Sequence, residues 1–303
     1  MPFRILPLLP QQRPHLGRAG IVGRVSVLLS ALILVVASLS TAPAAANARD
    51  DVRIVCDGAV EKTVRRLLTS AEARQRGIDA SVLPAMEPTD AVQAVIRDEV
   101  DVLLIANPVP LPEHGEDLAV TAWAATPVIL AANERVPVTD LKLDDLVAML
   151  GGWTTHWPDG TRVRLLLPPQ SWRDLQSIQH ASPGVAYAID RALKRPGMAI
   201  VNSDAELIDM LEAVPGSVGF STLAMLLSRE RQVKPLLIDG VEPSLAAEQF
   251  GLYRIERTVS LVRRRSPPLP VREVVAFLLS ERHEGVLRSR GLRPASSPMA
   301  FRD

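Results

Sequence analysis

The sequence has little cysteine and histidine, the side chains that most often bind metals or form cross-links. Cys56 is the one cysteine in 303 residues, which excludes an internal disulfide and a cysteine-based zinc site. The five histidines lack the spacing of a metal-ligand motif. We therefore predict no metal and no cofactor. Cys56 ends an apolar stretch, and we interpret it as a buried, unreactive thiol, because no histidine base is indicated near it.

Aromatic residues and net charge are scarce as well. Phe, Trp and Tyr make up 4% of the chain, and 34 Lys and Arg balance 34 Asp and Glu. Residues 1–48 contain four Arg and no acidic residue, so residues 49–303 hold 30 basic and 34 acidic residues, a net charge of −4. No basic patch with interleaved aromatic residues is present, which argues against a nucleic-acid partner.

Catalytic motifs are also missing from the sequence. Ser171 has no G-x-S-x-G context, so nucleophilic catalysis is not indicated. Asp144 and Asp145 stand together on one predicted helix face without a facing carboxylate, and we interpret them as solvated rather than as an acid–base pair. We predict that the protein is not an enzyme, and we name no catalytic residue.

A long apolar run occurs once, near the N-terminus. The run Val25–Ser40 follows a leader whose charged residues are all basic, and it precedes Ala46-Asn47-Ala48, an A-x-A cleavage pattern. We predict a signal peptide over residues 1–48, cleaved after Ala48, and a mature chain that starts at Arg49. An uncleaved membrane anchor is the alternative, and the run is short for a spanning helix. The leader residues are Arg4, Arg13, Arg18 and Arg24.

Strands and helices alternate from residue 52 onward. Two helices are predicted between these strands from the helical spacing of apolar residues. One covers Glu61–Arg76, and the other has Thr89 or Asp90 as its N-cap. This order is typical of an α/β fold with a parallel sheet covered by helices. The predicted strands are Val52–Cys56, Ala80–Ala85 and Val100–Ala106.

The rest of the chain continues the alternation. Gly151-Gly152 ends one of the predicted helices, and Gly291 and Pro294 follow the last one. We predict strands over Leu118–Asn133, Val163–Leu167, Val233–Ile238 and Tyr253–Val262, and helices over Leu141–Leu150, Asp174–His180 and Val271–Arg288.

The stretch Asn202–Ala224 predicts a helix, a tight turn and a strand. Ser203 and Glu206 have the spacing of a capping box at the helix start. Pro215-Gly216 ends the helix, because proline cannot continue it and glycine adopts the turn conformation. Gly219 lies within the predicted strand and leaves room for a close neighbour.

Two further features leave alternatives open. Trp153 and Trp157 flank His156, and we favour packing in the core or on the surface over an aromatic clamp for a ligand. Arg263–Arg265 is a short basic run. It is either a solvated face or a docking patch for an acidic partner.

Four segments, in their order and spacing, resemble the phosphate-binding protein of bacterial phosphate ABC transporters. This family belongs to the periplasmic substrate-binding proteins, which have two lobes and a hinge. The resemblance covers most of the mature chain. The segments are Gly58 with the helix after the first strand, Val138–Gly160, the stretch EAVPGSVGFSTL within residues 212–223, and Phe277–Pro294.

The resemblance implies a type II periplasmic-binding-protein fold, in which each lobe is a mainly parallel sheet flanked by helices. The first lobe would comprise residues 49–126 and 240–303, and the second residues 127–239. Thr126–Ala132 and Val241–Tyr253 would form a two-segment hinge. A ligand would then bind between the lobes, where backbone N–H groups at helix starts favour an anion. The protein would be a monomer.

The implied ligand-binding residues depart from the family pattern. Ala59, Val60 and Glu61 replace small hydroxyl residues, and the Glu61 carboxylate would repel an anion. Arg173 could supply a replacement charge, because its guanidinium matches oxyanions. The implied residues are Gly58, Ala59 and Val60 in the first loop, Asn107 after the third strand, and Ser171, Trp172 and Arg173 in the second lobe.

These features predict a secreted, periplasmic solute-binding protein that captures a small anionic ligand, phosphate or another oxyanion, for an ABC transporter. Permease subunits would be its partners. The altered loops favour a second hypothesis, a related protein that does not transport and that acts through protein partners such as a membrane sensor. The two hypotheses differ in whether a solute binds.

Overall fold

The computed structural model describes residues 51–106, 109, 111–112, 117–168, 178, 182–228, 232–247 and 255–295. The chain divides into two units, Met1–Arg49 and Asp50–Asp303. All described residues lie in the second unit. Within the described part, no helix has both the length and the apolar character needed to cross a membrane. The predicted signal peptide and the helix Asp174–His180, apart from Ile178, lie outside it.

One mixed sheet organises the second unit. Its strand order is β2-β1-β3-β11-β4-β8-β6-β7, and β12 and β9 both pair with β4. The strands are β1 (Val52–Cys56), β2 (Ala80–Val82), β3 (Val102–Ala106), β4 (Leu118–Asn133), β6 (Arg164–Leu167), β7 (Ala199–Ile200), β8 (Ser217–Thr222), β9 (Val233–Pro235), β11 (Glu256–Arg264) and β12 (Arg293–Pro294).

The three strands at each end of this order are parallel, and the middle strands are antiparallel. β1 pairs in parallel with β2 and β3, and β6 pairs in parallel with β7 and β8. β11 pairs antiparallel with both β3 and β4, and β4 pairs antiparallel with β8. The predicted α/β class, with mainly parallel sheets flanked by helices, is therefore confirmed, and the antiparallel pairs involve β4 and β11 in the middle of the sheet.

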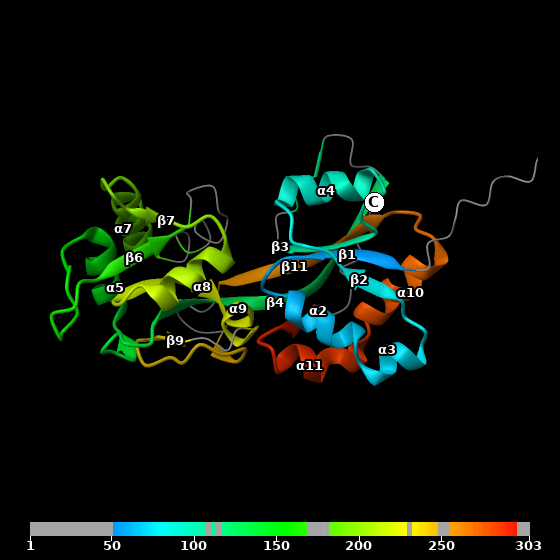
Figure 1. Cartoon of the computed structure of the whole chain (residues 1–303). Helices are drawn as coiled ribbons and strands as arrows, with labels where there is room; N and C mark the ends of the chain where they lie inside the picture. Colours follow the sequence, from blue (N-terminus) through cyan, green and yellow to red (C-terminus); the bar gives the residue numbers. More distant parts are fainter. Residues whose placement is uncertain are drawn as a thin grey trace, which may run out of the picture. The chain divides into compact units, whose positions relative to one another are not determined.

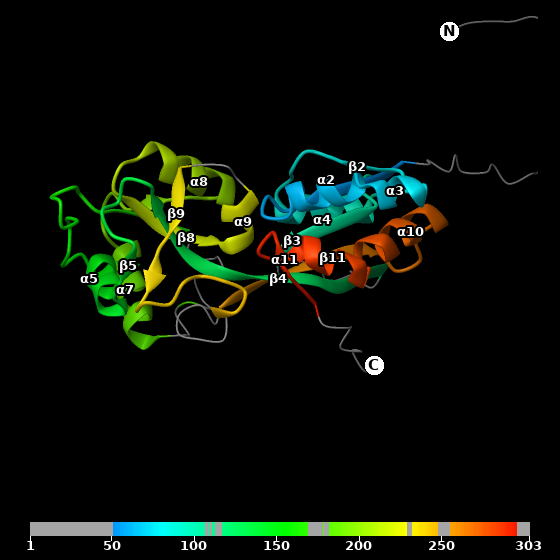
Figure 2. The ribbon, with the colours of Figure 1, turned by 90° about the horizontal axis from the view of Figure 1, so that it is seen from below.

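β4 joins the two halves of the sheet. Its first part, up to Pro127, pairs with β11, and its second part, from Val128 to Ala132, pairs with β8. The observed strand has the predicted bounds, and it contains the predicted crossing Thr126–Ala132. Figures 1 and 2 show β4 and β11 side by side between the two halves. The second predicted crossing, Val241–Tyr253, is described only as far as residue 247.

Helices cover both faces of the first half of the sheet. On β3, Val102 and Leu104 belong to one buried cluster, and Leu103 and Ile105 to another. The first cluster also takes in residues of α2, α3, α10 and α11, which lie opposite α4 in Figure 1. These helices are α2 (Glu61–Leu68), α3 (Ala71–Gln75), α4 (Pro88–Ile96), α10 (Leu269–Leu278) and α11 (Glu284–Arg288), with the 3-10 helix η5 (Glu281–His283) before α11.

The second half of the sheet has the same layering. On β6, Leu166 packs into the cluster that contains α8 residues, and Leu165 and Leu167 pack into the cluster that contains residues of α5 and α7. β5 (Asp140–Leu141) and β10 (Leu237–Ile238) form a separate parallel pair. The helices of this half are α5 (Leu143–Gly151), α7 (Pro183–Leu193), α8 (Asp204–Ala213) and α9 (Leu223–Ser228).

Two predicted helices are interrupted in the structure. The predicted Glu61–Arg76 divides into α2 and α3, because Thr69 Oγ1 donates to the Arg65 carbonyl oxygen (2.9 Å) and Ser70 Oγ accepts the N–H of Ala73 (3.1 Å). Hydroxyl side chains thereby end one helix and begin the next. The predicted Val271–Arg288 divides into α10, η5 and α11.

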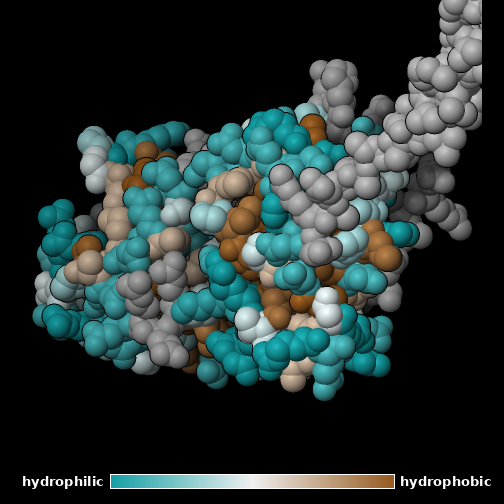
Figure 3. Space-filling view, turned by 45° about the vertical axis from the view of Figure 1, so that its right-hand side comes forward, coloured by the Kyte–Doolittle hydropathy of each residue, from teal (hydrophilic) through white to brown (hydrophobic). Residues whose placement is uncertain are grey.

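Other differences from the predicted elements are small or concern short elements. α4 begins at Pro88 with Glu87 at its N-cap, so the predicted caps Thr89 and Asp90 are wrong and lie within the first turn. The predicted strand Val233–Ile238 is two short strands, β9 and β10. The sequence analysis did not predict α7, β7 or α9. Figure 3 shows that hydrophilic residues cover most of one face of the molecule and that apolar residues form smaller groups among them.

Candidate functional site at the starts of α2 and α8

The structure brings three of the predicted site residues together. Gly58, Ala59 and Val60 form the loop between β1 and α2, and Val60 is the N-cap of α2. The other predicted site residues (Asn107, Ser171, Trp172 and Arg173) lie outside the described residues. The candidate site is therefore built from the β1–α2 loop and from the described elements that contact it.

Asp57 accepts three consecutive backbone N–H groups at the start of α2. The N–H of Ala59 donates to Asp57 Oδ1 (2.9 Å). The N–H groups of Val60 and Glu61 donate to the Asp57 carbonyl oxygen (3.0 and 3.1 Å). Free N–H groups at a helix start are the groups that bind an anion. In this loop, a residue of the chain itself already takes these three donors.

Apolar side chains cover the same loop. Ala59 and Val60 are buried, and a Cβ added at Gly58 would lie 3.2 Å from Met225 Cε of α9. Glu61, which we expected to repel an anion, pairs with Arg65 (2.8 Å). The pairing reduces its negative field toward the loop.

A buried ion pair links β11 with the start of α8. Arg257 of β11 donates through Nη1 to Asp204 Oδ2 and through Nη2 to Asp204 Oδ1, the latter at 3.3 Å. The side chains are 6% and 8% exposed. Asp204 is the first residue of α8, so its carboxylate also lies at the favourable end of the helix dipole. A guanidinium that pairs with a carboxylate in this two-pronged way is held in one orientation.

The charges of Asp204 and Arg257 affect the pKa of Asp57. Burial raises the pKa of the Asp57 carboxyl group above its ordinary value, and the negative charge of Asp204 raises it further. The positive charge of Arg257 opposes this effect on the pKa. Asp57 is half-buried, and its carboxyl group therefore lies close enough to the buried Asp204–Arg257 pair for both charges to affect its pKa.

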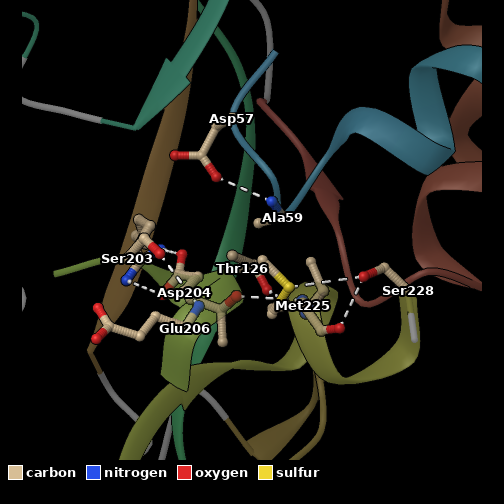
Figure 4. A network of polar contacts seen from close by, with 11 residues as sticks. Asp57, Ala59, Thr126, Ser203, Asp204, Glu206, Met225 and Ser228 are labelled. Carbon is tan, nitrogen blue, oxygen red and sulfur yellow. Dashed lines mark hydrogen bonds and ion pairs between the residues drawn. The ribbon is translucent and has the colours of Figure 1, made fainter. Parts of the chain in front are cut away.

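Hydrogen bonds tie the surrounding elements together, as Figure 4 shows. Ser203 Oγ accepts the N–H of Glu206 (3.1 Å), and Glu206 Oε2 accepts the N–H of Asn202 (2.7 Å). The predicted serine cap is therefore confirmed, and Glu206 reaches back as predicted, although to the N–H of the residue before the cap. Thr126 Oγ1 of β4 accepts the N–H of Ala224 at the start of α9 (3.0 Å).

The sequence analysis missed the three charged residues of this site. None of Asp57, Asp204 and Arg257 was singled out from the sequence. Arg257 stands in the strand ERTVSLVRR, which also contains Glu256, Arg263 and Arg264, so the sequence pattern did not mark this arginine as the buried one. The partner itself lies 53 residues away, and sequence spacing does not reveal it.

The arrangement suits binding of a small polar molecule. Arg257 carries a guanidinium whose planar geometry matches an oxyanion. Cys56 is buried, and burial raises the pKa of its thiol, so it is not a ready nucleophile. Among the described residues, no group of three or more His, Cys, Asp or Glu could hold a metal ion.

Comparison with known proteins gives similarity in structure only. No family model matches the chain, and no curated protein matches it in sequence. A solved structure from Clostridium perfringens, described as a phosphate ABC transporter substrate-binding protein with bound phosphate, is similar with a TM-score of 0.64 and 13% identity. The match covers 81% of this chain and 100% of that one.

Two other solved structures are similar over nearly their whole length. PEB3 with bound L-phospholactate has a TM-score of 0.58 and 12% identity, with 80% of this chain and 99% of that chain covered. An ABC-type phosphate transport receptor from Vibrio cholerae has a TM-score of 0.52 and 16% identity, with the same coverage of 80% and 99%. The protein thus has the two-lobed α/β fold of the type II periplasmic binding proteins, as its sequence predicted.

Proposed function

We propose that the protein is an exported solute-binding protein that captures a small anionic ligand and presents it to the permease subunits of an ABC transporter. Its lobes would comprise residues 49–126 with 240–303, and residues 127–239. The observation that carries the proposal is the buried Arg257–Asp204 pair beside Asp57. This pair joins β11, in the proposed first lobe, to α8 in the proposed second lobe.

The proposed ligand competes with Asp204 for the guanidinium of Arg257. Ligand binding and closure around β4, which both lobes share, would then be coupled. Asp57 already occupies the backbone donors at the start of α2, and a dianion would meet two neighbouring carboxyl groups. We therefore propose a singly charged anion, such as a carboxylate, rather than phosphate.

Thermal unfolding against a panel of anions tests the proposal. The mature protein, from Arg49, is unfolded, stripped of solutes and refolded, and its melting temperature is measured with small carboxylates, phosphate, sulfate and organophosphates. A ligand at about 100 times its dissociation constant adds about 2.7 kcal/mol to the free energy of unfolding, a shift of several degrees. A shift with a carboxylate supports the proposal, and a shift with phosphate alone contradicts the choice of ligand.

Two arginine variants locate the site. Arg257→Lys keeps a positive charge but loses the two-pronged geometry, so it should reduce the ligand-induced shift. Arg53→Lys is the matched control, because Arg53 also lies on a strand and pairs with a carboxylate, Asp101 (2.9 Å). Equal ligand-induced shifts in both variants would place the ligand elsewhere.

A second candidate function is an accessory or sensory protein that binds no solute. The specific observation in its favour is that Asp57 takes three N–H donors that a ligand would otherwise use. No melting shift with any member of the panel would favour this function. Export is common to both proposals, and N-terminal sequencing of the secreted protein should begin at Arg49.

A further inference from the structure

α5 and α7 carry an exposed aromatic and basic surface away from the candidate site. Trp153 follows α5 and is 62% exposed, and Tyr187 of α7 is 58% exposed. Arg191 lies one helical turn after Tyr187 on α7. Exposed large aromatic residues that lie together are candidates for an interaction surface.

The two rings hold the guanidinium of Arg191. Its central carbon lies 5.5 Å from the centre of the Trp153 ring and 5.8 Å from the centre of the Tyr187 ring. Arg191 Nη1 also donates to Tyr187 Oη (3.4 Å). Cation–π contacts of this kind orient the guanidinium while its charge stays uncompensated. Within the described residues, Arg191 has no ion-pair partner.

Arg195, which follows α7, brings a second guanidinium to Gly152 at the end of α5. A Cβ added at Gly152 would lie 2.4 Å from Arg195 Nη1, so the end of this side chain packs closely against the end of α5. Its Nε is buried without a hydrogen-bond partner in the described part of the chain. Its Nη2 makes a weak contact with Met198 Sδ (3.9 Å).

The Gly151-Gly152 pair makes room for both side chains. A Cβ at Gly151 would lie 2.6 Å from the Trp153 ring, and Gly152 has a φ of +84°, which favours glycine. The glycines that end α5 therefore also allow Trp153 and Arg195 to pack beside the helix end. Trp153, Tyr187, Arg191 and Arg195 form what we call the α5–α7 surface.

The charges of the α5–α7 surface indicate what it binds. Arg191 lies in the last turn of α7, and Arg195 follows the C-cap of that helix, so both positive charges lie near its C-terminal end. Lys194 is exposed between them and adds a third positive charge. Asp144 and Asp145 lie in the first turn of α5, at the opposite end of that helix. A carboxylate at this surface would be attracted by these positive charges and could accept hydrogen bonds from the guanidinium of Arg191.

We propose that the α5–α7 surface binds an acidic segment of a partner protein. Trp, Tyr and Arg are the residues that most often dominate binding energy at protein interfaces. The guanidinium forks fit carboxylates, and the aromatic rings fit apolar side chains between them. This interaction is separate from ligand binding at Arg257, and it holds for a transport or a sensory role.

A peptide titration tests this proposal. The probe is a fluorescent synthetic peptide of alternating glutamate and leucine, and the matched probe replaces each glutamate with glutamine. Binding to the mature protein is measured by fluorescence polarisation at low salt and at 0.5 M salt. We expect binding of the glutamate peptide that salt weakens, and at least tenfold weaker binding of the glutamine peptide.

Variants of the surface decide where the peptide binds. Arg191→Gln and Arg195→Gln should each weaken binding about tenfold, and Trp153→Ser should weaken it at both salt concentrations. Arg66→Gln is the control, because Arg66 is an exposed arginine on α2. This variant should bind the glutamate peptide with the same affinity as the unchanged protein. Circular dichroism confirms that each variant is folded.

Two results would overturn the proposal. One is that the glutamate peptide does not bind, or binds the surface variants as well as the unchanged protein. The other is that the surface binds vesicles containing phosphatidylglycerol and not the peptide, which would identify an anionic membrane as its partner.

Discussion

At the scale of single residues, Asp57 combines two roles in the β1–α2 loop. Its carboxylate holds the N–H of Ala59, and its charge lies near the Asp204–Arg257 pair. The raised pKa means that the ionised form is less stable in the folded protein than in the unfolded chain. The ionised carboxyl group therefore lowers the free energy of unfolding at neutral pH.

Asp57→Asn should remove this pH-dependent loss of stability. In the unfolded chain the carboxyl group ionises near pH 4, whereas in the folded protein it holds its proton to higher pH. Stability is therefore reduced as pH rises from about 4 through the folded-state pKa, and each unit of raised pKa corresponds to about 1.4 kcal/mol. Asparagine keeps the acceptor for Ala59, so the variant should gain stability over this range.

Urea unfolding of the Asp57→Asn variant at pH 4 to 8 measures this effect. Asp159→Asn is the control, because the exposed Asp159 makes the same local hydrogen bond, from the N–H two residues later (2.8 Å). If the Asp57 variant followed the pH profile of the unchanged protein, the proposed burial of this carboxyl group would be wrong.

The Asp204–Arg257 pair should show strong coupling in a double-mutant cycle. Asp204→Leu or Arg257→Met alone leaves a buried charge without this partner and should cost about 3–5 kcal/mol. The double variant should cost less than the sum of the two, because neither charge remains. Denaturant unfolding gives all four free energies. Glu284 and Arg288, an exposed pair at 2.7 Å, provide a control cycle with coupling below about 1 kcal/mol.

At the scale of elements, tight contacts at β8 restrict which residues the strand can contain. A Cβ added at Gly219 would lie 2.7 Å from the carbonyl oxygen of Leu166 on β6 and 2.9 Å from Leu207 Cδ1 on α8. The sequence predicted that this glycine leaves room for a neighbour, and the structure confirms it. β6, β8 and α8 are thus packed too closely for a larger residue.

Gly219→Ala should therefore destabilise the protein by about 1–3 kcal/mol, the usual cost of overpacking. Gly285→Ala is the control, because a Cβ at Gly285 meets no atom within 4 Å, and alanine favours the helix by up to about 1 kcal/mol. Thermal and denaturant unfolding measure both variants. Equal stabilities would show that β8 can shift away from β6 and α8.

Local signals predicted some elements better than others. The bounds of β4 and the caps of α8 were predicted correctly, because apolar runs and capping pairs are local properties. The breaks within residues 61–76 and 271–288 were missed, because the apolar spacing continues across them. α7 has a Ser182 cap and buried residues at helical spacing, such as Val185, Ile189 and Ala192. Its signal was therefore present in the sequence. α9 has six residues, fewer than two helical turns, which is too short for apolar periodicity to show a helix.

At the scale of the whole molecule, β4 is the shared element of the proposed lobes. It pairs with β11 along its first part and with β8 along its second part. One buried cluster includes residues of α2 and α10 together with residues of α8 and α9. Motion of one half against the other would therefore rearrange contacts at α9 and at the Asp204–Arg257 pair.

Small-angle X-ray scattering tests whether ligand binding changes this arrangement. If the proposed function is right, a solute that raises the melting temperature should also reduce the radius of gyration, because the lobes close on it. A solute from the same panel that leaves the melting temperature unchanged serves as the control. Stabilisation without compaction would argue against hinge closure.

The sequence alone determined the alternation of strands and helices, the helix cap at Ser203 and Glu206, and the similarity to the type II fold. These depend on the period of apolar residues and on side chains within one helical turn. The tertiary structure decided which charges meet. Asp57, Asp204 and Arg257 come together because β11 lies between β3 and β4 in the sheet. Their burial and mutual electrostatics arise from this long-range packing, which local sequence patterns do not encode.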